Sequence, residues 1–92
     1  MIRDIKHKGL ERFFTKGKKT GIRPEHEKRL RLILARLSAA REPKDMNLPG
    51  LRLHMLSGDL VGYWSVTVSA NWRVIFKYEN EEFYDVDYLD YH

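Results

Sequence analysis

The sequence predicts an α+β domain in which one N-terminal strand and two helices precede a four-strand antiparallel meander, with the helices packed on one face of the sheet. Two early segments repeat apolar residues at helical spacing, and four later segments show the alternation of strands, separated by short turns. Consecutive strands joined in this way pair antiparallel. A chain of 92 residues has room for one core, so we expect a single domain over residues 1–92.

The first half of the chain is expected to supply an edge strand and both helices. Residues 2–6 form the short strand, and residues 8–16 form the first helix, which Gly17 ends as a left-handed cap. The second helix has Pro24 in its first turn and runs to about Ala40. The apolar residues that face the core are Leu10, Phe13 and Phe14 in the first helix and Leu30, Ile33, Leu34 and Leu37 in the second.

Residues 62–78, with the sequence GYWSVTVSANWRVIFKY, predict a β-hairpin with one apolar face. A two-residue loop at 70 and 71 would place Val68 opposite the charged Arg73, whereas a three-residue loop at 69–71 keeps apolar residues paired. We expect the longer loop, because an asparagine tolerates the left-handed conformation that it needs. The resulting pairs are Val68 with Trp72, Val66 with Val74 and Trp64 with Phe76.

A strand on each side of the hairpin completes the meander. In residues 51–56 the alternation directs the apolar side chains, including Met55, to the core and His54 away from it. The last strand is expected at about residues 82–89. Its core side would hold Tyr84, Val86 and Tyr88, and its other side Asp85 and Asp87.

Because both helices cover one side of the sheet, we expect the other side, here called the helix-free face, to be open. The polar residues expected on it are Arg52, His54, Ser65, Thr67, Arg73 and Lys77, with Asp90, Tyr91 and His92 at its edge. Such a face suits cleavage of RNA, whose 2′-hydroxyl is the nucleophile. A base must take the proton of that hydroxyl, an acid must protonate the leaving oxygen, and positive charge must stabilise the phosphorane.

The candidate catalytic residues are therefore His54, Arg73, Asp90, Tyr91 and His92, with either histidine as base or acid. Three of them also have a simpler structural interpretation. Arg73 can pair with Asp85 or Asp87 across the strands, His54 can be a surface histidine, and His92 can be a frayed terminus. The four histidines lie on different elements without the spacing of metal ligands, so neither a metal nor a cofactor is expected.

Positive charge is concentrated before the sheet. Residues 1–45 contain 14 Lys and Arg against 6 Asp and Glu, whereas residues 46–92 contain 3 against 7. This imbalance fits binding to a polyanion such as RNA, although a solvated helix surface has the same composition. The candidate RNA-binding residues are Lys16, Lys18, Lys19, Arg29, Arg31, Arg36, Arg52 and Lys77. The chain has no cysteine, no signal peptide and no long apolar run, which fits a cytoplasmic protein.

Three segments together show a resemblance to a known family: IRDIKHKGLERFFTKG at the start, LHMLSGDLVGYWSVTVSANWRVIFKY in the middle, and VDYLDYH at the end. They resemble the HigB-like plasmid-maintenance killer toxins of the RelE superfamily. The resemblance implies a RelE-like fold and a ribosome-dependent endonuclease that cuts mRNA in the ribosomal A site. It also implies a helix-turn-helix antitoxin of the HigA kind, through which alone operator DNA would be bound. The residues that match functional positions of the family are His54, Arg73, Asp90, Tyr91 and His92.

The chain departs from the family pattern at Ser57, where members often carry a lysine. Arg52 or Lys77 would then have to supply that phosphate contact. Two other functions stay open, because the same fold serves ParE-like inhibitors of DNA gyrase, which lack the terminal histidine, and a degenerate toxin can act only with its antitoxin in repression. His54 together with the closing DYH favours the nuclease.

Overall fold

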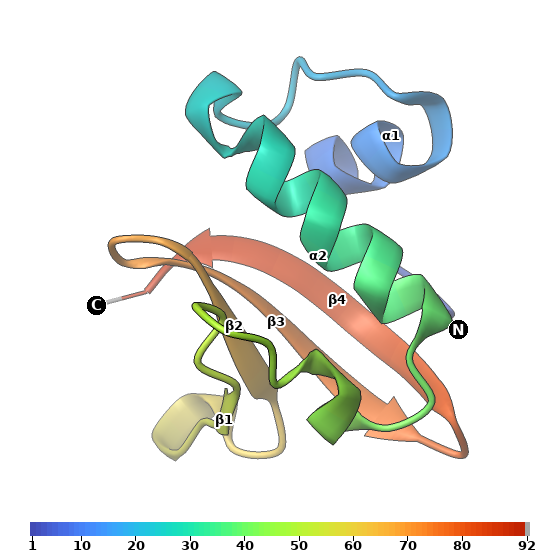
Figure 1. Ribbon diagram of the computed structural model, residues 1–92, viewed down its shortest axis with the longest axis vertical. Helices are drawn as coiled ribbons and strands as arrows, with labels where there is room; N and C mark the ends of the chain where they lie inside the picture. Colours follow the sequence, from blue (N-terminus) through green and yellow to red (C-terminus); the bar gives the residue numbers. More distant parts are fainter. Residues whose placement is uncertain (92) are drawn as a thin grey trace.

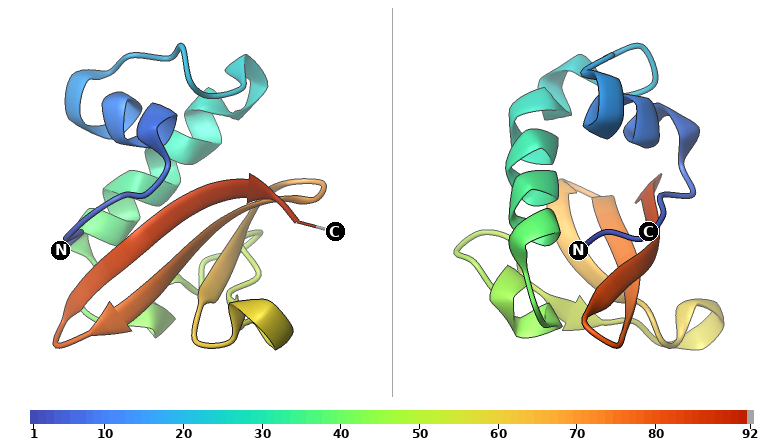
Figure 2. Two further views of the ribbon diagram at one scale, coloured as in Figure 1. Left: turned by 180° about the vertical axis from the view of Figure 1, so that it is seen from behind. Right: turned by 90° about the vertical axis from the view of Figure 1, so that its right-hand side faces the viewer.

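The computed structural model describes residues 1–91, which form two α-helices and one antiparallel sheet of strand order β1-β2-β3-β4. The elements are α1 (Lys8–Lys16), α2 (Glu27–Ala39), β1 (His54–Met55), β2 (Trp64–Ser69), β3 (Trp72–Glu79) and β4 (Glu82–Asp90), with 3₁₀ turns at Pro24–His26, Pro43–Met46 and Gly58–Leu60. Both helices lie on one side of the sheet (Figure 1, Figure 2). The predicted α+β architecture is confirmed. No helix within residues 1–91 is long and apolar enough to span a membrane.

The first helix, α1, has the predicted bounds, whereas α2 begins at Glu27, after the 3₁₀ turn that contains Pro24, and ends as predicted. Gly17 caps α1 with φ 70°, a left-handed conformation that costs glycine little. The four leucine and isoleucine residues expected on the core face of α2 are all buried. In α1, Leu10 and Phe13 are buried, but the side chain of Phe14 is 40% exposed. The apolar stripe of α1 is therefore narrower than predicted.

The N-terminal segment lies beside β4 and runs parallel to it. Two isolated bridges, Ile2 with Phe83 and Ile5 with Val86, replace the continuous edge strand that was predicted. The ladder is interrupted between them because Asp85 has φ 51°, and its N–H donates to the Oδ1 atom of Asp4 instead of to a backbone carbonyl. The apolar side chains of Ile2 and Ile5 pack against the core under the helices.

The hairpin of β2 and β3 has two of its three predicted pairs, Val66 with Val74 and Trp64 with Phe76. The third prediction is wrong, because Trp72 pairs with Ser69 and the register shifts at Val68. The extra residue forms a bulge, which leaves Val68 unpaired but still buried. The residue with a left-handed conformation in the turn is Ala70, at φ 52°, and not the asparagine.

A second bulge changes the faces of β4. Lys77 pairs with Tyr84 and Ile75 pairs with Asp87, so β4 has one extra residue between these pairs. Phe83, Val86 and Tyr88 therefore face the helices, whereas Tyr84 projects from the opposite face. The prediction that Tyr84 lies on the core side is wrong for this reason.

The strand predicted at residues 51–56 is reduced to the two residues of β1. Arg52, at φ 51°, has a conformation that no strand can continue through. Leu51 is fully buried, but the side chain of Met55 is 56% exposed, so its predicted place in the core is wrong.

The helix-free face is not open as predicted. Residues 56–63 fold back over it, and Leu56, Tyr63 and Ile75 form a second buried cluster there. Leu60, Leu89 and Tyr91 pack around this cluster and are partly buried. The sheet is thus covered on both sides near its centre, and only the parts of the face beside this cluster remain accessible.

A buried cluster of rings joins α2 to the end of β4. The Nδ1 atom of His26 lies 2.7 Å from the hydroxyl oxygen of Tyr88, and the His26 ring packs edge-on against Trp72. His26 is only 3% exposed, and this burial lowers the pKa of its imidazole below the ordinary value of 6.5. The cluster holds Trp72 directly beside Arg73 and opposite Asp90.

The pH dependence of stability should follow from this lowered pKa. Since the unfolded chain binds the proton more readily, the contribution of His26 is complete above pH ~6.5 and declines as the pH falls through the folded-state pKa. Urea unfolding followed at pH 5 to 8 should show this loss in the parent protein. A His26→Gln variant should show less of it, and His54→Gln, which removes an exposed histidine, should leave it unchanged. Equal pH profiles for the parent and His26→Gln would contradict the assignment.

Candidate active site

Cross-strand pairing places His54 and Arg73 on the helix-free face. His54 pairs with Ser65, and Ser65 pairs with Ile75. Directly opposite residues of antiparallel strands project from the same face, and Arg73 lies two residues from Ile75 on β3. From the spacing of strands and of residues along them, the Cα atoms of His54 and Arg73 are about 12 Å apart. Because the side chains of histidine and arginine each extend several ångströms from Cα, this separation allows both to contact one phosphate group.

His54 is exposed on β1, and one of its ring nitrogens is already engaged. Its Nδ1 atom lies 2.9 Å from the carbonyl oxygen of Arg52. Because a carbonyl only accepts hydrogen bonds, Nδ1 carries the proton in this arrangement. In the neutral ring, Nε2 is then the unprotonated nitrogen, which is the form that a general base requires.

Arg73 is half-buried beside the hairpin turn. Its Nη1 atom donates to the carbonyl oxygens of Ala70 at 2.6 Å and Trp72 at 3.1 Å. Its Nε and Nη2 atoms make no hydrogen bond with any residue from 1 to 91, so the guanidinium keeps an edge that can donate to a ligand. The simpler interpretation, an ion pair with Asp85 or Asp87, is absent from the part of the chain that the structure describes.

The end of β4 is brought to the same turn. The Tyr91 N–H donates to the carbonyl oxygen of Asn71 at 2.7 Å, and the Tyr91 side chain packs at the edge of the second cluster. Tyr91 is therefore on the helix-free face near Arg73. Asp90 pairs with Trp72, whose ring packs on the helix side of the sheet. Asp90 is therefore at a position of β4 that faces the helices, and not at one that shares the face of Arg73. His92 lies outside the described residues.

The predicted RNA-binding residues do not form one surface. Lys16, Lys18, Lys19, Arg31 and Arg36 belong to the helices and the loop between them, on the side of the sheet away from His54. Of these, Lys19 and Arg31 both pair with the carboxylate of Glu27, at 3.3 Å and 2.8 Å. Lys16, Lys18 and Arg36 are exposed. Arg52 is exposed next to β1, and Lys77 lies on the helix-free face, 5.0 Å from the centre of the Tyr63 ring.

Arg29 has a structural role that the sequence did not reveal. Its Nη2 atom donates to the carbonyl oxygen of Gly50 at 2.6 Å, and its Nε atom approaches the carbonyl oxygen of Thr67 at 3.5 Å. The guanidinium therefore connects α2 to the loop before β1 and to β2. Because these bonds use Nε and Nη2, Arg29 keeps fewer N–H groups with which to contact a phosphate.

Replacing Arg29 should destabilise the fold, whereas replacing Arg36 should not. Arg29→Ala removes hydrogen bonds from a charged donor, each worth about 1.5–3 kcal/mol. Arg36→Ala removes an exposed side chain and should change stability by less than about 0.5 kcal/mol. The free energy of unfolding, measured from urea denaturation of both variants, tests this difference. Equal values for the two would show that Arg29 is not a structural link.

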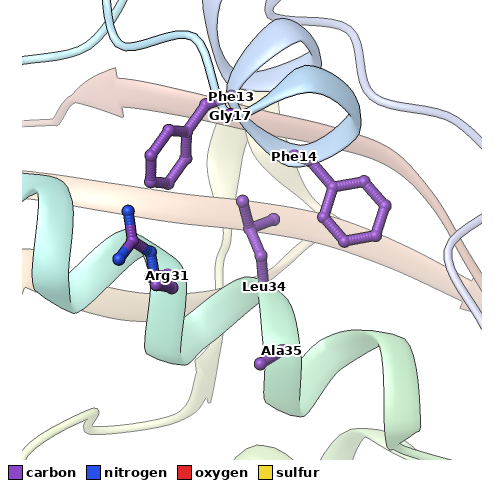
Figure 3. A pocket seen from close by; sticks show the side chains of 6 residues that line it. All are labelled: Phe13, Phe14, Gly17, Arg31, Leu34 and Ala35. Carbon is purple, nitrogen blue, oxygen red and sulfur yellow. The ribbon is translucent and has the colours of Figure 1, made fainter.

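A cavity of about 250 Å³ opens between α1 and α2, away from this site. Figure 3 shows Phe13 and Phe14 of α1 facing Leu34 of α2 across it, with Arg31 at one side. None of its lining residues belongs to the sheet. Residues 1–91 also contain no group of three or more His, Cys, Asp and Glu side chains placed to hold a metal ion. The candidate active site is thus a shallow surface of the sheet.

The helix-free face differs from the expectation in two ways. The hydroxyls of Ser65 and Thr67, which were expected there, are buried between His54 and Arg73 and have no hydrogen-bond partner among the described residues. Lys6 also projects over this face, with its Nζ atom 3.4 Å from the Tyr63 hydroxyl. The alternation of residues 2–6 contained the signal for Lys6, since Ile5 faces the core and the next side chain must point the other way.

Comparison with known proteins gives two matches over the length of the chain. The family model described as RelE-like toxin of type II toxin-antitoxin system HigB matches residues 3–92. The chain is also 41% identical over 92 residues to Endoribonuclease HigB of Proteus vulgaris, with 100% of each chain covered.

Proposed function

Because the chain belongs to the HigB-like family of RelE-like toxins from type II toxin-antitoxin systems, we propose that it is an endoribonuclease that cleaves mRNA in the ribosomal A site. The name of its Proteus vulgaris relative supports the nuclease activity. The observation that carries the proposal is the placement of His54 and Arg73 on one face, with the end of β4 beside them. That face presents a base and a cationic donor on either side of a space for one phosphate.

In the proposed reaction, Nε2 of His54 takes the proton of the RNA 2′-hydroxyl, and the 2′-oxygen attacks the adjacent phosphorus. The free edge of Arg73 donates to the non-bridging oxygens as negative charge grows on them. The bond from phosphorus to the 5′-oxygen then breaks, and His92 gives a proton to this leaving oxygen. The products are a 2′,3′-cyclic phosphate and a free 5′-hydroxyl, without a metal ion. Tyr91 would orient the nucleotide, and Asp90 would orient His92 or serve as an alternative base.

The proposed setting is the bacterial cytoplasm, with the ribosome as a partner. Three exposed cations on the helix side, Lys16, Lys18 and Arg36, would contact ribosomal RNA through its phosphates. Membership of a type II toxin family implies an antitoxin. We propose that this is a HigA-like helix-turn-helix protein, through which the complex binds operator DNA.

Cleavage should depend strongly on the ribosome. The candidate site is a shallow face, so the RNA must be positioned by something other than the toxin. Single-turnover rates measured on naked mRNA and on ribosomes programmed with the same mRNA should differ by several orders of magnitude in favour of the ribosome. Comparable rates on both would contradict A-site cleavage but not nuclease activity. Primer extension showing no cuts in cells, with replication arrest instead, would favour gyrase inhibition.

Loss of the proposed groups should slow cleavage without unfolding the protein. We expect Arg73→Ala to lower the single-turnover rate about 10²–10³-fold. His54→Ala and deletion of His92 should each lower it about 10²–10⁴-fold. All rates are measured at saturating toxin on programmed ribosomes, with thermal unfolding as the folding check. Arg12→Ala is the control, because Arg12 is an exposed arginine on the helix side. Each of these three variants is tested separately. If one of them cleaves at a rate within about threefold of the parent, the effect is smaller than the loss of a catalytic group should cause, and that residue is not part of the mechanism.

A further inference from the structure

Two lysines flank one buried tyrosine on the helix-free face. The Nζ atom of Lys6 lies 3.4 Å from the Tyr63 hydroxyl, and the Nζ atom of Lys77 lies 5.0 Å from the centre of the Tyr63 ring. Tyr63 is 8% exposed and packs with Ile75, so it is a fixed contact for both ammonium groups. Lys6 meets its hydroxyl group, and Lys77 lies near its ring, where a cation gains a modest attraction.

These residues come from three distant parts of the chain, and backbone bonds fix each of them. The Lys6 N–H donates to the carbonyl oxygen of Val86 at 2.7 Å beside β4. The backbone of Tyr63 is held on both sides, since its N–H donates to Leu60 at 3.1 Å and its carbonyl oxygen accepts from Leu56 at 2.9 Å. Lys77 is part of the β3 ladder. The arrangement is therefore a consequence of the fold and not of a flexible surface.

Neither ammonium group is neutralised by a direct ion pair within residues 1–91. The hydrogen bond to Tyr63 raises the pKa of the Lys6 ammonium, and Asp87 and Asp85 act in the same direction more weakly. No carboxylate lies within 4.0 Å of either Nζ atom among residues 1–91. Lys6 is exposed and Lys77 is half-buried, so an anion can reach both.

The pair lies on the same face as Arg73 but beyond Ile75. Lys77 is four residues from Arg73 on β3, so their Cα atoms are about 13 Å apart. This separation is too large for Lys77 to contact the same phosphate as Arg73. The separation is compatible with Lys77 contacting a different phosphate, a short distance along the same RNA strand.

We propose that Lys6 and Lys77, both in contact with Tyr63, form a binding subsite for a backbone phosphate of the RNA, one or two nucleotides from the bond that is cut. The inference rests on the proposed nuclease function. The subsite contributes affinity and register but no proton transfer. Lys77 was expected to contact RNA from the sequence, and Lys6 and Tyr63 complete the site. A charge-assisted hydrogen bond from each ammonium would hold the phosphate oxygens.

The test compares Lys6→Gln, Lys77→Gln and the double variant with Lys28→Gln, which removes an exposed lysine on α2 at the other side of the molecule. Single-turnover cleavage is measured on programmed ribosomes over a range of toxin concentrations. The double variant should need about tenfold more toxin for half-maximal rate, from the loss of two solvent-exposed charge contacts. Its maximal rate should stay within about threefold of the parent, since no proton-transfer group is lost. Arginine at both positions should restore most of the affinity.

Synthetic mRNA with neutral methylphosphonate linkages close to the cleavage site identifies the phosphate. The parent should lose affinity at one such linkage, and the double variant should lose nothing further there. Equal losses for parent and double variant at every linkage, or no difference between the double variant and Lys28→Gln, would overturn the subsite.

If the parent does not cleave on ribosomes, the proposed function fails, and the subsite is tested by binding alone. Fluorescence anisotropy with a single-stranded RNA oligonucleotide gives the salt dependence of the binding constant. Removing one phosphate contact should reduce the slope of log K against log salt by about 0.7 for the double variant but not for Lys28→Gln. An unchanged slope, or no RNA binding by the parent, would overturn the inference.

Discussion

The pairing of β3 with both β2 and β4 is the interaction on which the rest of the structure depends. On one side of β3, Val74 and Phe76 are buried under the helices, and on the other Ile75 is buried under residues 56–63. A strand buried on both faces fixes the register of its neighbours, because a slip of one residue would exchange the two sets of side chains. The same register determines where Arg73 and Lys77 project, so the site inherits its geometry from the core.

The fold followed from the sequence where periodicity was long and uninterrupted. Both helices and the central pairs of the hairpin have the predicted positions, because burial of an apolar stripe outweighs local preferences there. The predictions for Val68 and Tyr84 were wrong at bulges, which shift a strand by one residue and leave no mark in the alternation. The role of Arg29 could not be predicted either. Its long side chain donates to the carbonyl oxygen of Gly50, which is distant in sequence, and no local pattern indicates that contact.

The candidate site was predictable in its composition more than in its arrangement. The alternation of side chains along the strands predicted that His54 and Arg73 share a face, and the cross-strand pairs of β1, β2 and β3 confirm it. The tautomer of His54 depends on a bond to Arg52 within an irregular segment, and the cover over Ile75 depends on a 3₁₀ turn, so neither follows from a two-residue period. Lys6 became part of the face only through parallel pairing with a strand about eighty positions later.

That distant pairing has a consequence for when the fold is completed during synthesis. The N-terminal segment has no partner until β4 exists, and β4 also carries Asp90 and Tyr91 to the hairpin turn. Contacts between the two ends of a sequence form late, because closing so long a loop is entropically unfavourable until other contacts shorten it. During synthesis, which exposes the chain from its N-terminus, the sheet therefore stays incomplete until the last strand has emerged. A toxin built in this way completes its helix-free face only after nearly the whole chain has been translated.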